Sequence, residues 1–212
     1  MNHSRTRYLQ EMGIEQWVLR VPVAPKAEAH TPAAKLTLEQ LQAKAADCSA
    51  CPLHSTRTQV AFARGNPKAD IMVIGEAPGF YEDKQGAPFV GKAGKLLDKM
   101  LHAVGFTQDD VYIANIIKCR PPDNRDPKAD EIKQCSDFIA KQIELVQPKL
   151  ILALGRFAGQ YLIEQPLTLA KMRQSKHEYQ SIPVLVSYHP AYLLRNPIDK
   201  KKAYQDLLNL RR

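Results

Sequence analysis

Residues 70–94 read DIMVIGEAPGFYEDKQGAPFVGKAG, and this stretch indicates both a fold and a binding site. The apolar run Ile71–Ile74 is short, ends at a glycine and is typical of a buried strand. It is followed by Glu76, a turn of proline and glycine, and then acidic and aromatic residues that include Phe89. A surface connection needs only polar residues and turn formers. We therefore expect this loop to hold a ligand.

Short apolar runs and longer helical segments alternate through the rest of the chain. We predict strands at Ile71–Ile74, Val111–Ile113, Leu150–Leu154 and Val184–Val186. We predict helices at Ala93–Val104, Ala129–Val146, Phe157–Glu164 and Lys201–Leu210. Short strands separated by helices are typical of a parallel sheet with helices on both faces. The predicted fold class is α/β, with three α/β/α layers around a central four-stranded parallel sheet.

Unusual polar residues follow several of the predicted strands. Glu76 comes after the first strand, Asn115 after the second, and His189 after the fourth. In a parallel sheet the carboxyl ends of the strands meet at one edge, where ligands bind. These three side chains are therefore expected to converge on one site.

The chain is predicted to have three parts. Residues 1–20 contain a compact amphipathic segment with the single tryptophan, and we interpret them as a partner-binding peptide. Residues 21–35 are rich in proline and alanine, which is typical of an extended, flexible linker. Residues 36–212 form the α/β domain, whose first helix is expected to begin near Thr37.

The composition favours a polyanionic partner. The chain has 212 residues, and 30 lysines and arginines against 22 acidic residues give a formal net charge of +8. This excess favours nucleic acid, although solubility alone would also explain it. No apolar run reaches the roughly 18 residues of a membrane-spanning helix. The N-terminus lacks the apolar region of a secretory signal, so we expect a cytoplasmic protein without a membrane partner.

Four cysteines, Cys48, Cys51, Cys119 and Cys135, suggest a metal centre. Structural disulfides are rare inside cells, and a close pair argues against scattered buried thiols. A redox pair at the first two positions would leave the other two unexplained. Four thiolates complete the ligand set of one zinc ion or one [4Fe–4S] cluster. The wide second spacing favours the cluster, and nearby basic residues are expected to favour thiolates.

Three longer motifs point to a known family. The segments GEAPGFYEDKQGAPFVGKAGKLL, NIIKCRPPDNR and SYHPAYLLR, with the cysteines in this order, resemble the family 4 uracil-DNA glycosylases. The resemblance spans roughly residues 45–210. It implies a glycosylase-like α/β/α fold, a [4Fe–4S] cluster on the four cysteines, and excision of uracil from DNA. The related family 5 enzymes lack a carboxylate in the first motif, whereas Glu76 is present here.

The resemblance gives three residues a role in uracil recognition. Phe89 would stack on the flipped base. Asn115 would pair with uracil O4 and N3–H, an arrangement that cytosine does not offer. His189 would donate a hydrogen bond to uracil O2 and stabilise the leaving anion. Taken singly, these residues could equally be a core phenylalanine, a turn asparagine and a structural histidine.

The carboxylates are harder to assign from the sequence. The resemblance implies that Glu76, Ala77 and Pro78 line the uracil site and that Glu82 also contacts it. Either glutamate could position the attacking water or face the positive charge that develops on the sugar. Family 1 enzymes carry a water-activating aspartate where this chain has Ala77. The identity of the general base therefore stays open.

The segment after the histidine is expected to enter the DNA. Residues 191–195 would fill the gap left by the flipped base, with Leu193 and Leu194 as wedge residues and Arg195 beside them. Apolar wedges between base steps are common among proteins that bind the minor groove.

The N-terminal segment RTRYLQEMGIEQWVLR resembles the peptide of the DNA polymerase III psi subunit that binds the chi subunit of the clamp loader. This implies chi as a partner for residues 5–20, although the segment could equally pack on its own domain. The main hypothesis is thus a monomeric, nucleoid-associated, monofunctional glycosylase that begins base excision repair. The alternatives are a non-catalytic DNA-binding replication accessory protein and a zinc-stabilised nucleotide-binding module.

Overall fold

A computed structural model of the chain describes residues 11–13 and 36–211, and the description below concerns residues 36–211. A six-stranded sheet has the order β1-β3-β2-β4-β6-β5. Its four inner strands are parallel: β2 (Ile71–Gly75), β3 (Val111–Asn115), β4 (Leu150–Leu154) and β6 (Ile182–Ser187). The central four-stranded parallel sheet and the α/β class are therefore confirmed.

Two edge strands were not predicted. The two residues of β1 (Arg64–Gly65) pair antiparallel with β3, and β5 (His177–Tyr179) pairs antiparallel with β6. The turn between β5 and β6 places Gln180 and Ser181 at φ of 49° and 68°. Left-handed residues of this kind form tight hairpins, usually with Asn or Gly. The usual sequence signal of a hairpin is therefore missing here.

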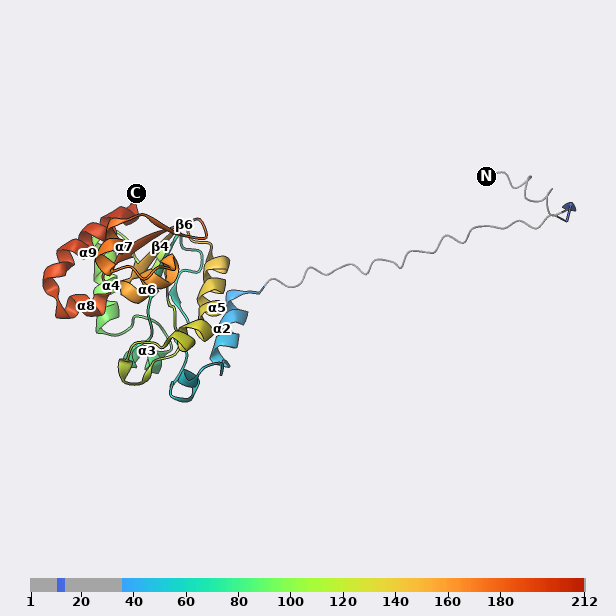
Figure 1. The fold of residues 1–212 in the computed structure, drawn as a ribbon, viewed down its shortest axis with the longest axis horizontal. Helices are drawn as coiled ribbons and strands as arrows, with labels where there is room; N and C mark the ends of the chain where they lie inside the picture. Colours follow the sequence, from blue (N-terminus) through green and yellow to red (C-terminus); the bar gives the residue numbers. More distant parts are fainter. Residues whose placement is uncertain (1–10, 14–35, 212) are drawn as a thin grey trace. The chain divides into compact units, whose positions relative to one another are not determined.

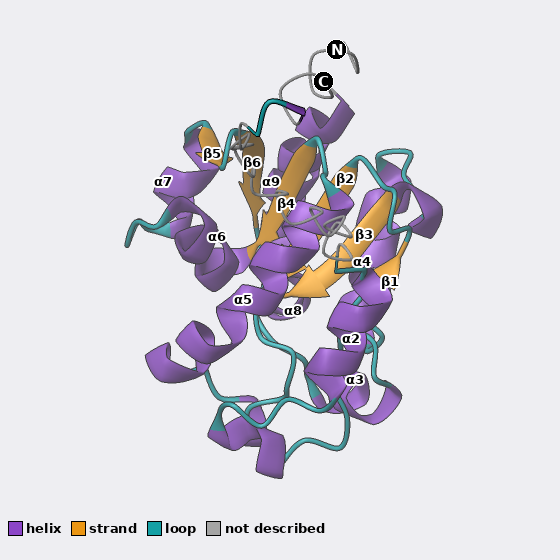
Figure 2. Ribbon diagram, turned by 90° about the vertical axis from the view of Figure 1, so that its right-hand side faces the viewer, coloured by secondary structure: helices purple, strands orange, loops and turns teal. Residues whose placement is uncertain are grey.

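Helices cover both faces of the sheet, as Figure 2 shows. The α-helices are α2 (Leu38–Ala46), α3 (Phe80–Gln85), α4 (Lys92–Ala103), α5 (Ala129–Val146), α6 (Gly155–Ile163), α7 (Leu169–Gln174), α8 (Pro190–Arg195) and α9 (Lys200–Leu207). Short 3-10 helices span Pro52–Ser55, Gln108–Asp110, Pro122–Asn124, Pro197–Asp199 and Leu208–Arg211. The four predicted helices are present, whereas the short helices α3, α7 and α8 were not predicted.

The alternation of side chains along the strands builds two cores. Met72 and Ile74 of β2 pack with residues of α5, α6 and α7 on one face. Ile71 and Val73 pack with residues of α4 and α9 on the other face. Successive residues of a strand point to opposite faces, so an uninterrupted apolar run indicates a strand covered on both sides. This confirms the three layers.

The helix α2 closes one side of the domain against α5. Its N-cap is Thr37, whose hydroxyl accepts a hydrogen bond from the N–H of Gln40, while the Gln40 side chain accepts one from Thr37 N–H. Leu41 and Ala45 pack with Phe62, with residues of α5 beside them, and Figure 1 shows α2 and α5 side by side. The predicted start of the helix near Thr37 is confirmed.

The strand order creates a crevice at the carboxyl edge. The chain leaves β2 toward β3 on one side, and it leaves the neighbouring strand β4 toward β6 on the other side. Loops diverge at such a switch point, and ligands of open α/β sheets bind there. In the described part of the chain, no helix is long and apolar enough to cross a membrane.

Candidate active site

A cavity of about 450 Å³ opens at this carboxyl edge. Its volume is within the range of roughly 300–1,000 Å³ that is usual for small-molecule sites. The expected uracil-contacting residues all line it: Glu76, Ala77, Pro78, Glu82, Phe89, Asn115 and His189. The loops after β2, β3 and β6 thus meet as the strand pattern predicted.

Asn115 is the last residue of β3 and pairs in register with Gly75 of β2. Its side chain is 1% exposed, and the side-chain oxygen Oδ1 has no hydrogen-bond partner among the described residues. A buried acceptor without a partner costs about 1–3 kcal/mol. Because the oxygen belongs to a residue that lines the cavity, we expect a ligand N–H to satisfy it.

Phe89 lies beside Asn115 in a strained backbone conformation. Its φ is 56°, which is unusual for a bulky residue and typical of functional loops. A Cβ atom on Gly94 would lie 1.6 Å from the carbonyl oxygen of Phe89. The Phe89 ring lies 5.6 Å from the His189 ring, centroid to centroid, at an interplanar angle of 34°. The two aromatic rings form one wall of the cavity.

His189 is held in one tautomer by the helix that follows it. It is the N-cap of α8, and its Nδ1 accepts a hydrogen bond from Ala191 N–H at 3.2 Å. Burial, together with the nearby charge of Arg195, lowers the pKa of His189 to about 4. The imidazole is therefore neutral near pH 7 and carries its proton on Nε2. This nitrogen is free to donate a hydrogen bond to a ligand.

The two glutamates of the cavity differ in environment. Burial, and then the charge of Asp126, raise the pKa of Glu76 to about 7, while Arg156 opposes the shift. Glu82 is 8% exposed, and its Oε1 accepts a hydrogen bond from Gly91 N–H at 2.9 Å. Glu82 therefore holds the loop in place, whereas the Glu76 carboxyl group changes charge near neutral pH.

The leucines of the expected wedge separate into two environments. Leu193 is fully buried on α8, which packs against α4, so it is unavailable as a wedge in this conformation. Leu194 is 44% exposed, and Arg195 is exposed at the rim of the cavity. The reason is helical geometry, because adjacent residues of α8 point about 100° apart.

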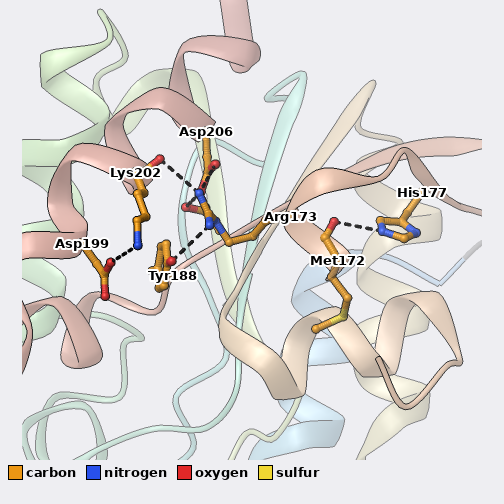
Figure 3. Close-up of polar contacts among 8 residues, drawn as sticks. Met172, Arg173, His177, Tyr188, Asp199, Lys202 and Asp206 are labelled. Atoms are coloured by element: carbon orange, nitrogen blue, oxygen red, sulfur yellow. Dashed lines mark hydrogen bonds and ion pairs between the residues drawn. The ribbon is translucent and has the colours of Figure 1, made fainter. Parts of the chain in front are cut away.

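An ion pair joins α7 to α9, two helices that are far apart in the sequence, and it contacts the residues before His189 (Figure 3). Arg173 of α7 donates to both carboxylate oxygens of Asp206 of α9, at 2.7 and 2.8 Å. Asp206 also accepts a hydrogen bond from the Ser187 hydroxyl at 2.7 Å. Arg173 further donates to the Tyr188 hydroxyl at 3.1 Å and lies 4.3 Å from its ring centroid. Ser187 and Tyr188, the two residues before His189, are thus held by Asp206 and Arg173.

A second contact continues this arrangement onto α8. The rings of Tyr188 and Tyr192 stack with centroids 5.5 Å apart. The Tyr192 hydroxyl donates to Asp199 at 2.9 Å, and Lys202 donates to the same carboxylate at 2.8 Å. Sequence reasoning missed these residues because the motifs assign chemistry to none of them. Asp126, which also lines the cavity and whose negative charge raises the pKa of Glu76, was missed as well.

The four cysteines lie around one small cavity, and no disulfide joins them. Arg57 donates to Cys119 Sγ at 3.2 Å and to the carbonyl oxygen of Cys48 at 2.8 Å. The backbone N–H of Lys118 approaches Cys135 Sγ at 3.4 Å. Within the described ranges, no three Cys, His, Asp or Glu side chains are arranged to hold a single metal ion. Four cysteine sulfur atoms around one cavity, with N–H groups directed at two of them, form a donor set that fits a group with four thiolate ligands.

Burial dominates the protonation of these thiols. It raises the pKa of Cys135 to about 11, and it raises the pKa of Cys119 despite the opposing Arg57. Basic neighbours do favour the thiolates, since Arg57 lowers the pKa of Cys119 and Lys118 lowers that of Cys135, but burial outweighs both. Lys118 lies fully buried beside them, and its Nζ donates to the carbonyl oxygen of Asn115 at 2.6 Å and to Gln142. One lysine thus connects the cysteine cavity to Asn115.

Comparison with known proteins agrees with this geometry. Residues 62–209 match the model of the uracil DNA glycosylase superfamily. A type-4 uracil-DNA glycosylase of Archaeoglobus fulgidus is 40% identical over 169 residues, which cover 76% of this chain and 85% of that protein. The type-4 protein of Thermotoga maritima is 41% identical over 161 residues, covering 75% and 84%.

A relative of another type shares less. A type-5 uracil-DNA glycosylase of Pyrobaculum aerophilum is 32% identical over 148 residues, covering 61% of this chain and 64% of that protein. The chain belongs to the uracil DNA glycosylase superfamily, in which it groups with the type-4 uracil-DNA glycosylases.

Proposed function

We propose that the protein is a monofunctional uracil-DNA glycosylase that flips uracil out of DNA and hydrolyses its N-glycosidic bond. This reaction begins base excision repair. The observation that supports it most directly is the unpaired Oδ1 of Asn115, buried in the same cavity as Phe89 and His189. Uracil offers the N–H donor that this oxygen lacks.

Recognition of the base follows from the three side chains. The Phe89 ring stacks on the uracil, and Asn115 accepts from N3–H and donates to O4. Cytosine presents an acceptor at N3 and a donor at N4, which would oppose the same amide. A site built on such pairs rejects the wrong base by about 10⁴-fold or more, because buried polar groups would be left unpaired. Asn115→Asp is expected to release less uracil and to discriminate less against cytosine.

The chemical step needs charge stabilisation on both sides of the breaking bond. The C1′–N1 bond breaks, the electron pair leaves with uracil, and water adds to C1′ with loss of a proton. The Nε2–H of neutral His189 donates to O2 and stabilises the departing anion. The Glu76 carboxylate faces the positive sugar or positions the water. No lysine is among the described residues that line the cavity, which supports a hydrolytic rather than a Schiff-base reaction.

The exposed Leu194 and Arg195 are proposed to enter the DNA beside the flipped nucleotide. Both lie on α8, whose N-cap is His189. Insertion of an apolar side chain unstacks a base step and stabilises the extrahelical base. We propose that the enzyme is a monomer. Because its substrate is chromosomal DNA, it would act in the cytoplasm, at the nucleoid.

We propose that Cys48, Cys51, Cys119 and Cys135 hold a [4Fe–4S] cluster. When bound, the cluster would cross-link the segment after α2 to the loop after β3 and to α5, a structural contribution. Iron and acid-labile sulfide in the purified protein, absent from Cys48→Ser, would support the proposal. Zinc in stoichiometric amount, without sulfide, would contradict it.

We also propose that residues 5–20 bind the chi subunit of the polymerase III clamp loader. Apart from residues 11–13, this segment lies outside the described residues. The proposal rests on the resemblance of the segment to the psi peptide. Titration of purified chi with the full chain, and with a chain that lacks residues 1–35, tests it. If chi binds both chains equally, or binds neither chain, the proposal is contradicted.

The experiment that tests the glycosylase is the release of free uracil from oligonucleotides. The substrates carry uracil opposite guanine, uracil opposite adenine, or uracil in a single strand. We expect release by the wild type, a loss of at least about 100-fold in His189→Ala, and no change in His102→Ala, an exposed histidine of α4. Absence of release from folded, iron-loaded protein would instead favour the DNA-binding accessory protein.

A further inference from the structure

Helix α3 presents two adjacent aromatic side chains to solvent. Phe80 is 47% and Tyr81 is 53% exposed, and their rings meet edge to face with centroids 5.4 Å apart. The next two residues, Glu82 and Asp83, are buried. The helix therefore buries its acids and exposes its aromatics, the reverse of the usual arrangement. Exposed aromatic pairs of this kind mark binding surfaces.

Two positive charges lie beside the Phe80 ring. The Lys84 ammonium lies 5.5 Å and the Arg120 guanidinium 5.2 Å from the Phe80 ring centroid. Arg120 also donates to Asn124 Oδ1 at 2.8 Å, which orients its guanidinium. Aromatic faces interleaved with cations are the usual surface for unpaired nucleic acid, since bases stack on the rings and phosphates contact the cations.

A groove continues from this helix to the start of α4. It has a volume of about 460 Å³, and Tyr81, Lys92 and Lys95 are among the residues that line it. Gly91 also lines the groove, and its N–H is bonded to Glu82 of the uracil cavity. Ala93, between the two lysines in sequence, lines the cavity itself. The groove and the cavity therefore share a wall.

We propose that the α3 surface, formed by Phe80, Tyr81, Lys84, Arg120, Lys92 and Lys95, binds the unpaired strand that flanks the target nucleotide. This inference rests on the proposed glycosylase function and adds a second nucleic-acid contact to it. Stacking on Phe80 and Tyr81 requires bases that are free of a complementary strand. The surface therefore favours uracil in single-stranded DNA, whereas the exposed end of α8 acts on duplex DNA.

The test compares single-stranded and duplex substrates with the full-length protein. In Phe80→Ala/Tyr81→Ala we expect KM for single-stranded substrate to rise about tenfold or more, with kcat unchanged and a smaller effect on duplex. In Lys92→Gln/Lys95→Gln we expect weaker binding with a reduced salt dependence. Tyr204→Ala, which removes a similarly exposed tyrosine from α9, is the matched control and should change nothing.

Two outcomes would overturn the proposal. One is an unchanged KM for single strands in the aromatic variant, and the other is an equal rise for single-stranded and duplex substrates. Binding of a uracil-free single strand, followed by fluorescence anisotropy, separates this proposal from the glycosylase function. Weaker binding in the aromatic variant supports the α3 surface even where no uracil is released.

Discussion

A Cβ atom on Gly75 would lie 2.4 Å from Oδ1 of Asn115, its partner in register on the neighbouring strand. The same atom would lie 2.5 Å from Cζ of Phe89. Contacts this short cannot exist without movement of one of the groups. The absence of a side chain at Gly75 therefore lets the amide and the aromatic ring meet at the floor of the cavity.

We expect Gly75→Ala to remain folded and to lose uracil release by about 100-fold, since a displacement of about 1 Å in a catalytic site has an effect of that size. Steady-state kinetics on single-stranded and duplex substrates would measure it, with thermal unfolding as the check on folding. Activity near that of the wild type would show that Asn115 and Phe89 are not fixed as described.

Glu76 predicts a pH dependence near neutrality. Its pKa is about 7 in the folded protein because of burial and the charge of Asp126, against an ordinary value of 4.5. If the carboxylate is the active form, kcat/KM, which reports the free enzyme, should rise with pH and level off above about 7. Glu76→Gln should remove this acid limb, and Asp126→Asn should move it to lower pH. If wild type and Glu76→Gln show the same rise of activity with pH, another group causes it.

The raised pKa of Glu76 also makes the stability of the folded protein depend on pH. Between 4.5 and about 7 the folded state binds the proton and the unfolded state does not. The contribution of Glu76 to stability is therefore greatest at low pH and declines as pH rises through this window. We expect Glu76→Gln to unfold at a higher temperature than wild type at about pH 8, with a smaller difference at about pH 5. Calorimetry at both pH values would test the sign.

The neighbouring leucines of α8 give a matched pair. Leu193→Ala removes a fully buried side chain and should lower the free energy of unfolding by about 2–5 kcal/mol. Leu194→Ala removes a side chain that is 44% exposed and should change stability by less than about 0.5 kcal/mol. Only Leu194→Ala should lower activity on duplex substrate while retaining activity on single strands. The reverse result would make Leu193 the wedge.

The sequence predicted the inner sheet because its strands have an unmistakable composition. Ile71–Ile74 is apolar throughout, which only a strand buried on both faces requires. The edge strands have no such signal, since β1 has two residues and the β5–β6 turn lacks glycine. Propensity is a weak guide where tertiary pairing decides the conformation.

The site was predictable to the extent that its residues belong to short motifs. Asn115 ends β3 and His189 comes two residues after β6, so their convergence follows from topology alone. The burial of Leu193 could not be predicted in the same way, because it depends on how α8 packs against α4. The same holds for Lys118, whose charged group reaches the Asn115 carbonyl through the interior.

The Arg173–Asp206 pair gives the last prediction. Its side chains are 13% and 10% exposed, and loss of one partner from a buried pair costs about 3–5 kcal/mol. Arg173→Lys keeps the charge but loses the two parallel hydrogen bonds to Asp206 and the contact with Tyr188. We therefore expect kcat to fall about tenfold with little change in KM, because His189 follows Tyr188 directly.

The control for this variant lies beside it in Figure 3. Lys202 pairs with Asp199, and the Lys202 side chain is 58% exposed. Such exposed pairs contribute about 0–1 kcal/mol, so Lys202→Gln should leave both stability and kcat nearly unchanged. If Arg173→Lys lowers stability but not kcat, the pair only supports the fold. If it lowers kcat at a temperature far below unfolding, the pair positions the histidine that stabilises the leaving base.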